Sequence, residues 1–152
     1  MIAKDTVIQI VNEKIAETDY FLISVEISQN NEIVVAIDSD FGVDLNFCAE
    51  LSRHIETILD REKEDFELEV GSYGISRPFA VVRQYSKNID KNVEILTQKG
   101  LKFRGVLVSV SPDFFAVEIE KMVKPDGKKR KELQKDTVNF NYSEIKYAKL
   151  DF

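Results

Sequence analysis

The chain has 152 residues, of which 43% are hydrophobic and 32% charged, and its formal net charge is −6. This length allows one domain or two small ones, and the composition is typical of a soluble globular protein. Its single cysteine, Cys48, excludes an internal disulfide, and no apolar run approaches the roughly 20 residues of a membrane span, so we expect a cytoplasmic protein without membrane contact.

The charges are divided unequally along the chain. Residues 1–82 contain 6 Lys and Arg against 17 Asp and Glu, a net charge of −11, whereas residues 83–152 contain 15 against 10, a net charge of +5. We therefore expect an acidic domain over 1–82 and a basic domain over 83–152, with a short linker around 78–90. An acidic surface suits basic proteins and a basic one suits phosphate backbones, while charge that serves only solubility is the alternative.

The first half of the chain predicts the element order α-β-β-α-β. Asp5 and Asp44 are good N-caps for helices, and Asn30 and Asn31 tolerate the positive φ of a hairpin turn. These elements define an α+β domain of the KH-like or split α/β type. Their expected ranges are a helix from residue 5, strands 20–28 and 32–38, a helix 45–63 and a strand 66–70.

Apolar periodicity assigns the buried side chains of these elements. In the first strand, one face is expected to carry Phe21, Ile23, Val25 and Ile27, because alternate residues of a strand share a face. In the second helix, the spacing of three and four predicts one buried stripe. That stripe comprises Cys48, Leu51, Ile55, Ile58 and Leu59.

The second half predicts a short helix within 79–89 and then short strands only. Five short strands in about 60 residues are too few for a sandwich, so they favour a small all-β barrel of the Sm-like or SH3 type. Gly105, inside one strand, would let that strand bend sharply to close the barrel. The strands are expected at 93–97, 101–110, 114–120, 137–140 and 147–150.

No residue pattern makes a convincing catalytic or metal site, and we expect neither a cofactor nor a metal. Asp38 and Asp40 follow an apolar strand, as the aspartates of a Mg²⁺-dependent phosphatase do, but the partner motifs for that chemistry are missing. His54 has no second ligand. Gly71 and Gly74 form a Gly-x-x-Gly pattern, for which a structural turn is the favoured interpretation over a KH-type clamp.

Basic residues gather in one segment of the second half, residues 121–135, which we call the basic segment. It is predicted to form a hairpin tip that gains affinity for phosphates through counterion release, with a merely solvated tip as the alternative. Lys102 and Arg104 are weaker candidates for the same role. The candidates within the basic segment are Lys124, Lys128, Lys129, Arg130 and Lys131.

The order of parts resembles the bacterial family of ribosome maturation factors called RimP. That family joins an α-β-β-α-β domain to an Sm-like barrel through a segment similar to Leu-Glu-Val-Ser-Ser-Pro-Gly-Leu-Asp-Arg-Pro. The corresponding segment here is residues 68–78, where seven positions match and four depart. The matches are Leu68, Glu69, Val70, Ser72, Gly74, Arg77 and Pro78, and the departures are Gly71, Tyr73, Ile75 and Ser76.

This resemblance implies a function without catalysis. It implies a monomeric factor that binds the immature small (30S) ribosomal subunit and assists its late assembly, contacting rRNA and a basic ribosomal protein near the decoding centre. Tyr73, Gly74, Arg77 and Pro78 are then the expected partner-binding or junction residues. A stand-alone RNA-binding regulator of the Sm or KH type remains the alternative, and a small Mg²⁺-dependent phosphatase a remote one.

Overall fold

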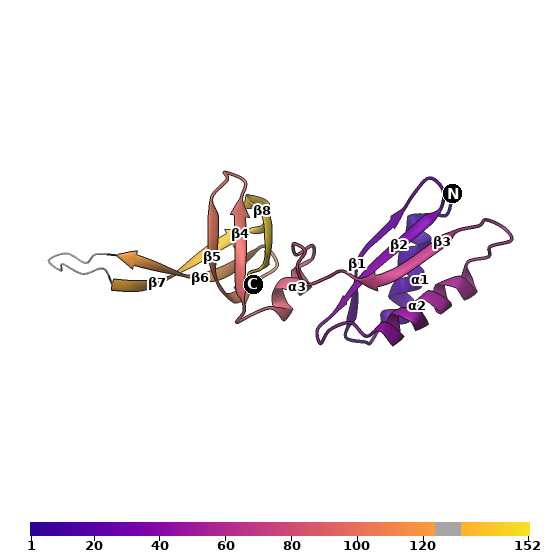
Figure 1. Cartoon of the computed structure of the whole chain (residues 1–152), viewed down its shortest axis with the longest axis horizontal. Helices are drawn as coiled ribbons and strands as arrows, with labels where there is room; N and C mark the ends of the chain where they lie inside the picture. The colour runs from indigo at the N-terminus through magenta and orange to yellow at the C-terminus, as the bar shows by residue number, and fades with distance from the viewer. Residues whose placement is uncertain (124–131) are drawn as a thin grey trace. The chain divides into compact units, whose positions relative to one another are not determined.

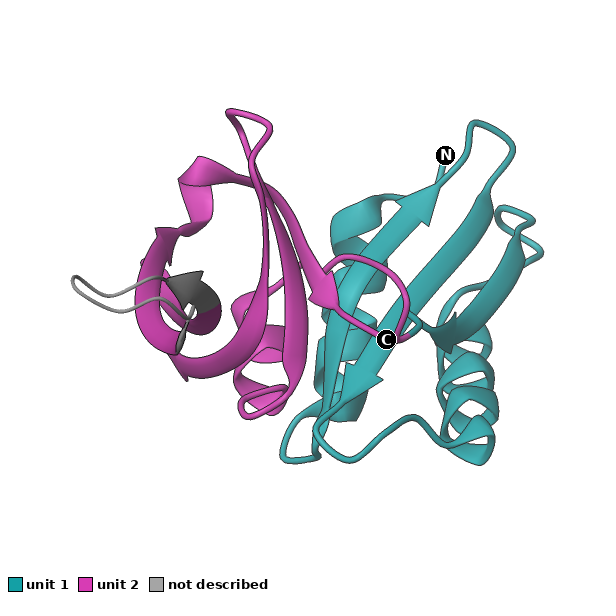
Figure 2. Ribbon diagram, turned by 60° about the vertical axis from the view of Figure 1, so that its left-hand side comes forward, with its two compact units in different colours: residues 1–74 teal, residues 75–152 magenta. Residues whose placement is uncertain are grey.

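The computed structural model describes residues 1–123 and 132–152. The chain divides into two compact units, Met1–Gly74 (unit 1) and Ile75–Phe152 (unit 2), coloured separately in Figure 2. Each unit has its own hydrophobic core and is described by itself. No helix in the described part of the chain is long and apolar enough to cross a membrane.

Unit 1 has the predicted order α-β-β-α-β (Figure 1). The three strands form one sheet in the order β1-β2-β3, with β1 antiparallel and β3 parallel to β2. Both helices contribute to a single core on one face of this sheet. The elements are α1 (Lys4–Ile15), β1 (Tyr20–Ile27), β2 (Glu32–Ser39), α2 (Leu45–Ile58) and β3 (Glu67–Ser72).

Three details of unit 1 differ from the expectations. The first helix starts at Lys4 after Ala3, so Asp5 lies in the first turn, where its carboxylate favours the helix dipole without capping a backbone N–H. The second helix stops at Ile58, which is 49% exposed rather than part of the buried stripe, because the chain turns away at the C-cap. A bulge between Leu22 and Ser24 breaks the alternation of β1, so Phe21 lies opposite Asp38, on the other face from Val25, where it is buried but outside the cluster packed against the helices.

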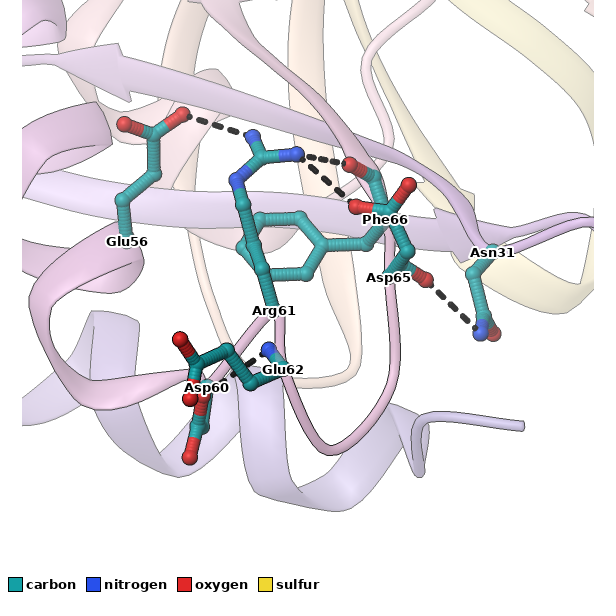
Figure 3. Close-up of polar contacts among 7 residues, drawn as sticks. All are labelled: Asn31, Glu56, Asp60, Arg61, Glu62, Asp65 and Phe66. Carbon is teal, nitrogen blue, oxygen red and sulfur yellow. Dashed lines mark hydrogen bonds and ion pairs between the residues drawn. The ribbon is translucent and has the colours of Figure 1, made fainter.

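The loop between α2 and β3 is closed by Arg61 (Figure 3). Its guanidinium donates to the carboxylates of Glu56 and Asp65, each at 3.2 Å, and to the carbonyl of Phe66, whose ring centroid lies 4.2 Å from it. Asn31, in the β1–β2 turn, donates to the carbonyl of Asp65 at 3.2 Å. The turn and the loop are therefore held together at the start of β3.

In its described part, unit 2 contains a short helix and five strands that form one antiparallel sheet in the order β7-β6-β5-β4-β8. The all-β sheet was predicted, but the described strands do not form a closed barrel. Among the described residues β7 and β8 remain the two edges, and a hollow of about 570 Å³ lies between the β4–β5 turn, β7 and η1. The elements are α3 (Val82–Lys87), β4 (Asn92–Thr97), β5 (Lys102–Val110), β6 (Phe114–Val123), β7 (Glu132–Asn141), the 3-10 turn η1 (Tyr142–Glu144) and β8 (Ile145–Leu150).

Aromatic rings fill the core of unit 2. Tyr85 from α3 packs against Phe115 and Tyr142, with ring centroids 4.9 Å and 5.1 Å away. Phe103 and Phe140 meet edge to face at 5.3 Å, although their strands, β5 and β7, are not neighbours in the sheet. The sheet is therefore strongly curved around these rings.

The β6–β7 hairpin extends beyond the rest of the sheet, as Figure 1 shows. The pairing of β5 with β6 ends at Glu118, whereas β6 and β7 stay paired as far as Val123 and Glu132. We call residues 120–123 and 132–135 the β-arm. Its four residue pairs have a length of about 14 Å at 3.4 Å per residue.

Candidate binding surfaces

One face of the unit 1 sheet is acidic. Val34, at its centre, lies directly between Glu26 on β1 and Glu69 on β3, and Glu32 lies directly beside Glu67. Residues in register share a face of the sheet, and this face is opposite to the one that packs against the helices. All five side chains are exposed, and those of β2 and β3 line a shallow hollow of about 170 Å³.

Within the described residues, the glutamates of this face have no basic partners. No ion pair reaches Glu26, Glu32, Glu67 or Glu69 among the described residues. Like charges directly opposite one another on neighbouring strands lower the stability of a sheet, so the Glu32–Glu67 pair does not stabilise this one. A surface of this kind is best neutralised by a basic partner.

Aspartates gather at one end of the same sheet. Asp38 lies in β2, and the backbone N–H of Asp40 donates to the carbonyl of Asp19 at 3.2 Å. Within residues 1–123 and 132–152, no group of three or more His, Cys, Asp and Glu side chains has the arrangement to hold a metal ion. The Asp38 and Asp40 pattern therefore gains no structural support as a phosphatase site.

The junction residues start at the end of β3. The backbone N–H of Tyr73 donates to the carbonyl of Ile37 at 2.9 Å, which extends the pairing of β3 with β2. Proline, the family residue at this position, has no N–H to make that bond. Gly74 has a φ of 99°, a region that favours glycine. Arg77 and Pro78 are exposed, and they fall in unit 2, whereas Tyr73 and Gly74 fall in unit 1.

The outward face of β4, β5 and β8 carries a network of charges around Glu94. Its carboxylate accepts from Arg104 Nη2 at 3.0 Å and from the Tyr147 hydroxyl at 2.8 Å, and Lys149 Nζ lies 3.8 Å away. Arg104 and Lys149 are the direct cross-strand neighbours of Glu94. Sequence reasoning missed this network, because only the strand register brings the three residues together.

The network changes the interpretation of the two candidates on β5. The pKa of Glu94 is held below its ordinary value by the hydrogen bonds from Tyr147 and Arg104, so the carboxylate stays charged. The hydrogen bond with Glu94 in turn raises the pKa of Arg104. The charge of Arg104 is thus partly balanced within the chain, whereas Lys102 is exposed beside it and makes no ion pair among the described residues.

The positive charge of unit 2 comes mainly from the basic segment. Residues 121–135 contain 7 Lys and Arg against 2 Asp and Glu, whereas the remainder of unit 2 contains 9 against 8. The described ends of this segment, 121–123 and 132–135, belong to the β-arm, which extends beyond the pairing with β5 (Figure 1). At its base, Lys135 forms an ion pair with Glu118 at 3.6 Å. The candidates Lys124, Lys128, Lys129, Arg130 and Lys131 lie outside the described residues.

Comparison with known proteins places the chain in a family. The described chain joins an acidic α/β unit to an antiparallel β unit through a Leu-Glu-Val…Arg-Pro segment. Residues 10–76 match the model of the RimP N-terminal domain. Three proteins named ribosome maturation factor RimP are similar to it over most of their length. The relative from Porphyromonas gingivalis is 39% identical, and the alignment covers 97% of both chains. The relative from Christiangramia forsetii is 39% identical, with 91% of this chain and 94% of the relative covered. The relative from Flavobacterium psychrophilum is 40% identical, with 78% of this chain and 77% of the relative covered. The chain is therefore a member of the RimP family.

Proposed function

We propose that this chain is a ribosome maturation factor that binds the immature small ribosomal subunit and assists its late assembly without catalysing a reaction. The observation that carries the proposal is the similarity, over 97% of both chains, to a relative with that name. In this proposal the protein acts as a cytoplasmic monomer and needs no cofactor. Its partners are rRNA and a basic ribosomal protein near the decoding centre.

The acidic unit supplies the surface for the ribosomal protein. Unit 1 contains 5 Lys and Arg against 17 Asp and Glu. Its open sheet face presents Glu26, Glu32, Glu67 and Glu69 around Val34, with none of the four glutamates neutralised by an ion pair in the described part of the chain. Complementary charge accelerates association and sets orientation, which suits a partner rich in lysine and arginine.

The basic segment supplies the contact to rRNA. Residues 121–135 carry 7 Lys and Arg against 2 Asp and Glu, so the segment has a net positive charge of its own, of which Lys135 is paired with Glu118. Lysines and arginines that neutralise phosphates release counterions, which makes binding strongly dependent on salt. Lys102 adds to this contact from β5, and Arg104 contributes less because it is paired with Glu94.

We also propose that unit 2 is an Sm-like barrel that closes through side chains rather than strand pairing, and that unit 1 is KH-like in type. The contact between Phe103 and Phe140, whose strands are not neighbours, supports this degree of curvature. So does Gly105, where an added Cβ would lie 2.3 Å from the carbonyl oxygen of Glu118 on the next strand.

Co-sedimentation with purified ribosomal subunits tests the function. The chain is expected to pellet with small subunits and not with large ones, and binding is expected to weaken steeply as salt rises. Equal binding to both subunits, or to neither, would overturn the proposal. A sizing column separates it from the Sm-type regulator, since a stable ring-like oligomer would favour the regulator and a monomer the maturation factor.

Charge variants of the basic segment test the contact to rRNA. Exchange of Lys128, Lys129, Arg130 and Lys131 for glutamine is expected to flatten the salt dependence of small-subunit binding. A matched control removes the same charge from four exposed lysines elsewhere: Lys14, Lys91, Lys99 and Lys146. Identical salt slopes for the two variants would show that the segment is merely solvated.

Arg77→Ala tests the junction. We propose that Arg77 either contacts the partner or sets the angle between the domains 1–82 and 83–152, so its loss should weaken small-subunit binding. Arg53→Ala, which removes an exposed arginine from α2, is the control. Unchanged affinity of a folded Arg77→Ala variant would remove the junction from the site.

A further inference from the structure

Two large apolar side chains of unit 1 are almost fully exposed. Phe41 is 85% exposed and Leu45 is 84% exposed, and they lie at either end of the turn that leads from β2 into α2. We call this pair the apolar tip. Single exposed apolar residues are common on proteins, so the tip needs further support before it is assigned a role.

The fold of unit 1 does not need these two side chains. The same segment already contributes Val43 and Phe47 to the core of the unit. Phe47 stacks on Tyr20 with ring centroids 3.8 Å apart. Core packing therefore explains why Val43 and Phe47 are apolar, but it does not explain Phe41 and Leu45.

The turn that presents the apolar tip is fixed by hydrogen bonds. The N–H of Phe41 donates to the hydroxyl of Ser39 at 3.2 Å, and the N–H of Gly42 donates to the carbonyl of Ser39 at 3.3 Å. The N–H of Asp44 donates to the Tyr20 hydroxyl at 2.9 Å, and Asp44 in turn caps α2. An anchor held in one conformation loses little entropy on binding, which is the property of a preformed contact residue.

The surroundings of the apolar tip are acidic. No lysine or arginine occurs between Lys14 and Arg53, a stretch that contains eight Asp and Glu residues. Asp40 and Asp44 belong to the turn itself, and Asp19 is hydrogen-bonded to it through its carbonyl. These charges repel a phosphate backbone and attract lysine and arginine, which favours a protein over rRNA as the partner of the tip.

We infer that the apolar tip is a docking anchor that inserts Phe41 into an apolar pocket of a basic protein of the small ribosomal subunit, while the acidic stretch around it attracts lysine and arginine at the rim of that pocket. This inference rests on the proposed function and adds a defined contact to it. A buried aromatic centre with a charged rim is the usual arrangement of a protein–protein hot spot.

Substitution of the apolar tip tests the inference with purified small subunits. Phe41→Ser is expected to weaken binding of the full chain about 10- to 30-fold, and Leu45→Ser is expected to weaken it less. Both side chains are exposed, so neither variant should unfold the protein. Phe152→Ser is the matched control, since Phe152 is 82% exposed but belongs to unit 2. Equal affinity of Phe41→Ser and the control would overturn the inference and leave the proposed function in place.

Photo-crosslinking identifies the partner class. A chain with p-benzoylphenylalanine in place of Phe41, bound to purified small subunits and irradiated, is expected to form a crosslink to a ribosomal protein. A crosslink to rRNA, or none from a chain that still co-sediments, would overturn the inference alone. Failure of the unmodified chain to bind small subunits would overturn both the inference and the proposed function.

Discussion

Gly105→Ala is predicted to destabilise unit 2 severely. Gly105 lies in β5, in register with Val93, where the backbone of β6 leaves no room for a side chain. A Cβ added there would lie 2.3 Å from the carbonyl oxygen of Glu118 and 2.8 Å from Cγ1 of Val117. Because the nearer of these atoms is backbone, the clash cannot be relieved by turning a side chain. The two strands must instead move apart.

The magnitude follows from the cost of overpacking. Forcing extra atoms into a packed interior costs about 1–3 kcal/mol, and two contacts below van der Waals distance place Gly105→Ala near the upper end. A loss of about 3 kcal/mol lowers the melting temperature of a unit of this size by roughly 12–24 °C. Gly71→Ala is the matched control, because a Cβ at Gly71 meets nothing within 4 Å.

Hydrogen exchange read by mass spectrometry separates the two units in the intact chain. Peptides from unit 2 are expected to lose protection in Gly105→Ala while those from unit 1 do not, and Gly71→Ala is expected to stay close to the unsubstituted chain. Unchanged protection of the β5 and β6 peptides in Gly105→Ala would refute the close approach of these strands.

Three further predictions concern single groups. Tyr147→Phe should lower the urea midpoint of unit 2, because the carboxylate of Glu94 loses a donor. The pKa of Glu94 is lowered in the folded chain, so the loss of stability should be complete above the ordinary pKa of 4.5 and should shrink as the pH falls through the folded-state pKa. A loss of stability that does not vary with pH would contradict the hydrogen bond from Tyr147 to Glu94. Burial, and then the charge of Asp44, raises the pKa of the Cys48 thiol, so alkylation at neutral pH should be slow in the folded chain and fast in urea, and equal rates would disprove its burial. Asp44→Ala should cost about 1 kcal/mol in a denaturation experiment, because the Asn46 N–H loses its acceptor at 2.9 Å, whereas Asp44→Asn keeps an acceptor and should cost little; similar losses would rule out the cap.

Local chemistry predicted much of unit 1. Asn31 adopts the positive φ, 57°, expected of the hairpin turn, and Asp44 caps α2 as its position indicates. Both are decided by residues a few positions apart, which a single sequence displays. The bulge in β1 is not, because it depends on how β1 meets β2, and it reversed the expected orientation of Phe21.

The candidate binding surfaces were harder to predict from the sequence. The bonds of Glu94 to Arg104 and Tyr147 link residues from three strands, so the register must be known before they can be proposed. The expected strand at 137–140 proved to be the end of the longer β7, since charged residues that face water can still pair along a hairpin. The exposure of Phe41 could not be predicted from the sequence either, because an apolar residue in a turn is ordinarily expected to pack inward.

The β-arm has a consequence for how such a chain can be varied. Its paired residues lie beyond Glu118, where the pairing of β6 with β5 ends, and the core residues described for unit 2 all lie outside the arm. We therefore expect changes of length or charge at the end of this hairpin to have little effect on the core of unit 2. Under the proposed function, affinity for rRNA could then be altered here at little cost in folding stability.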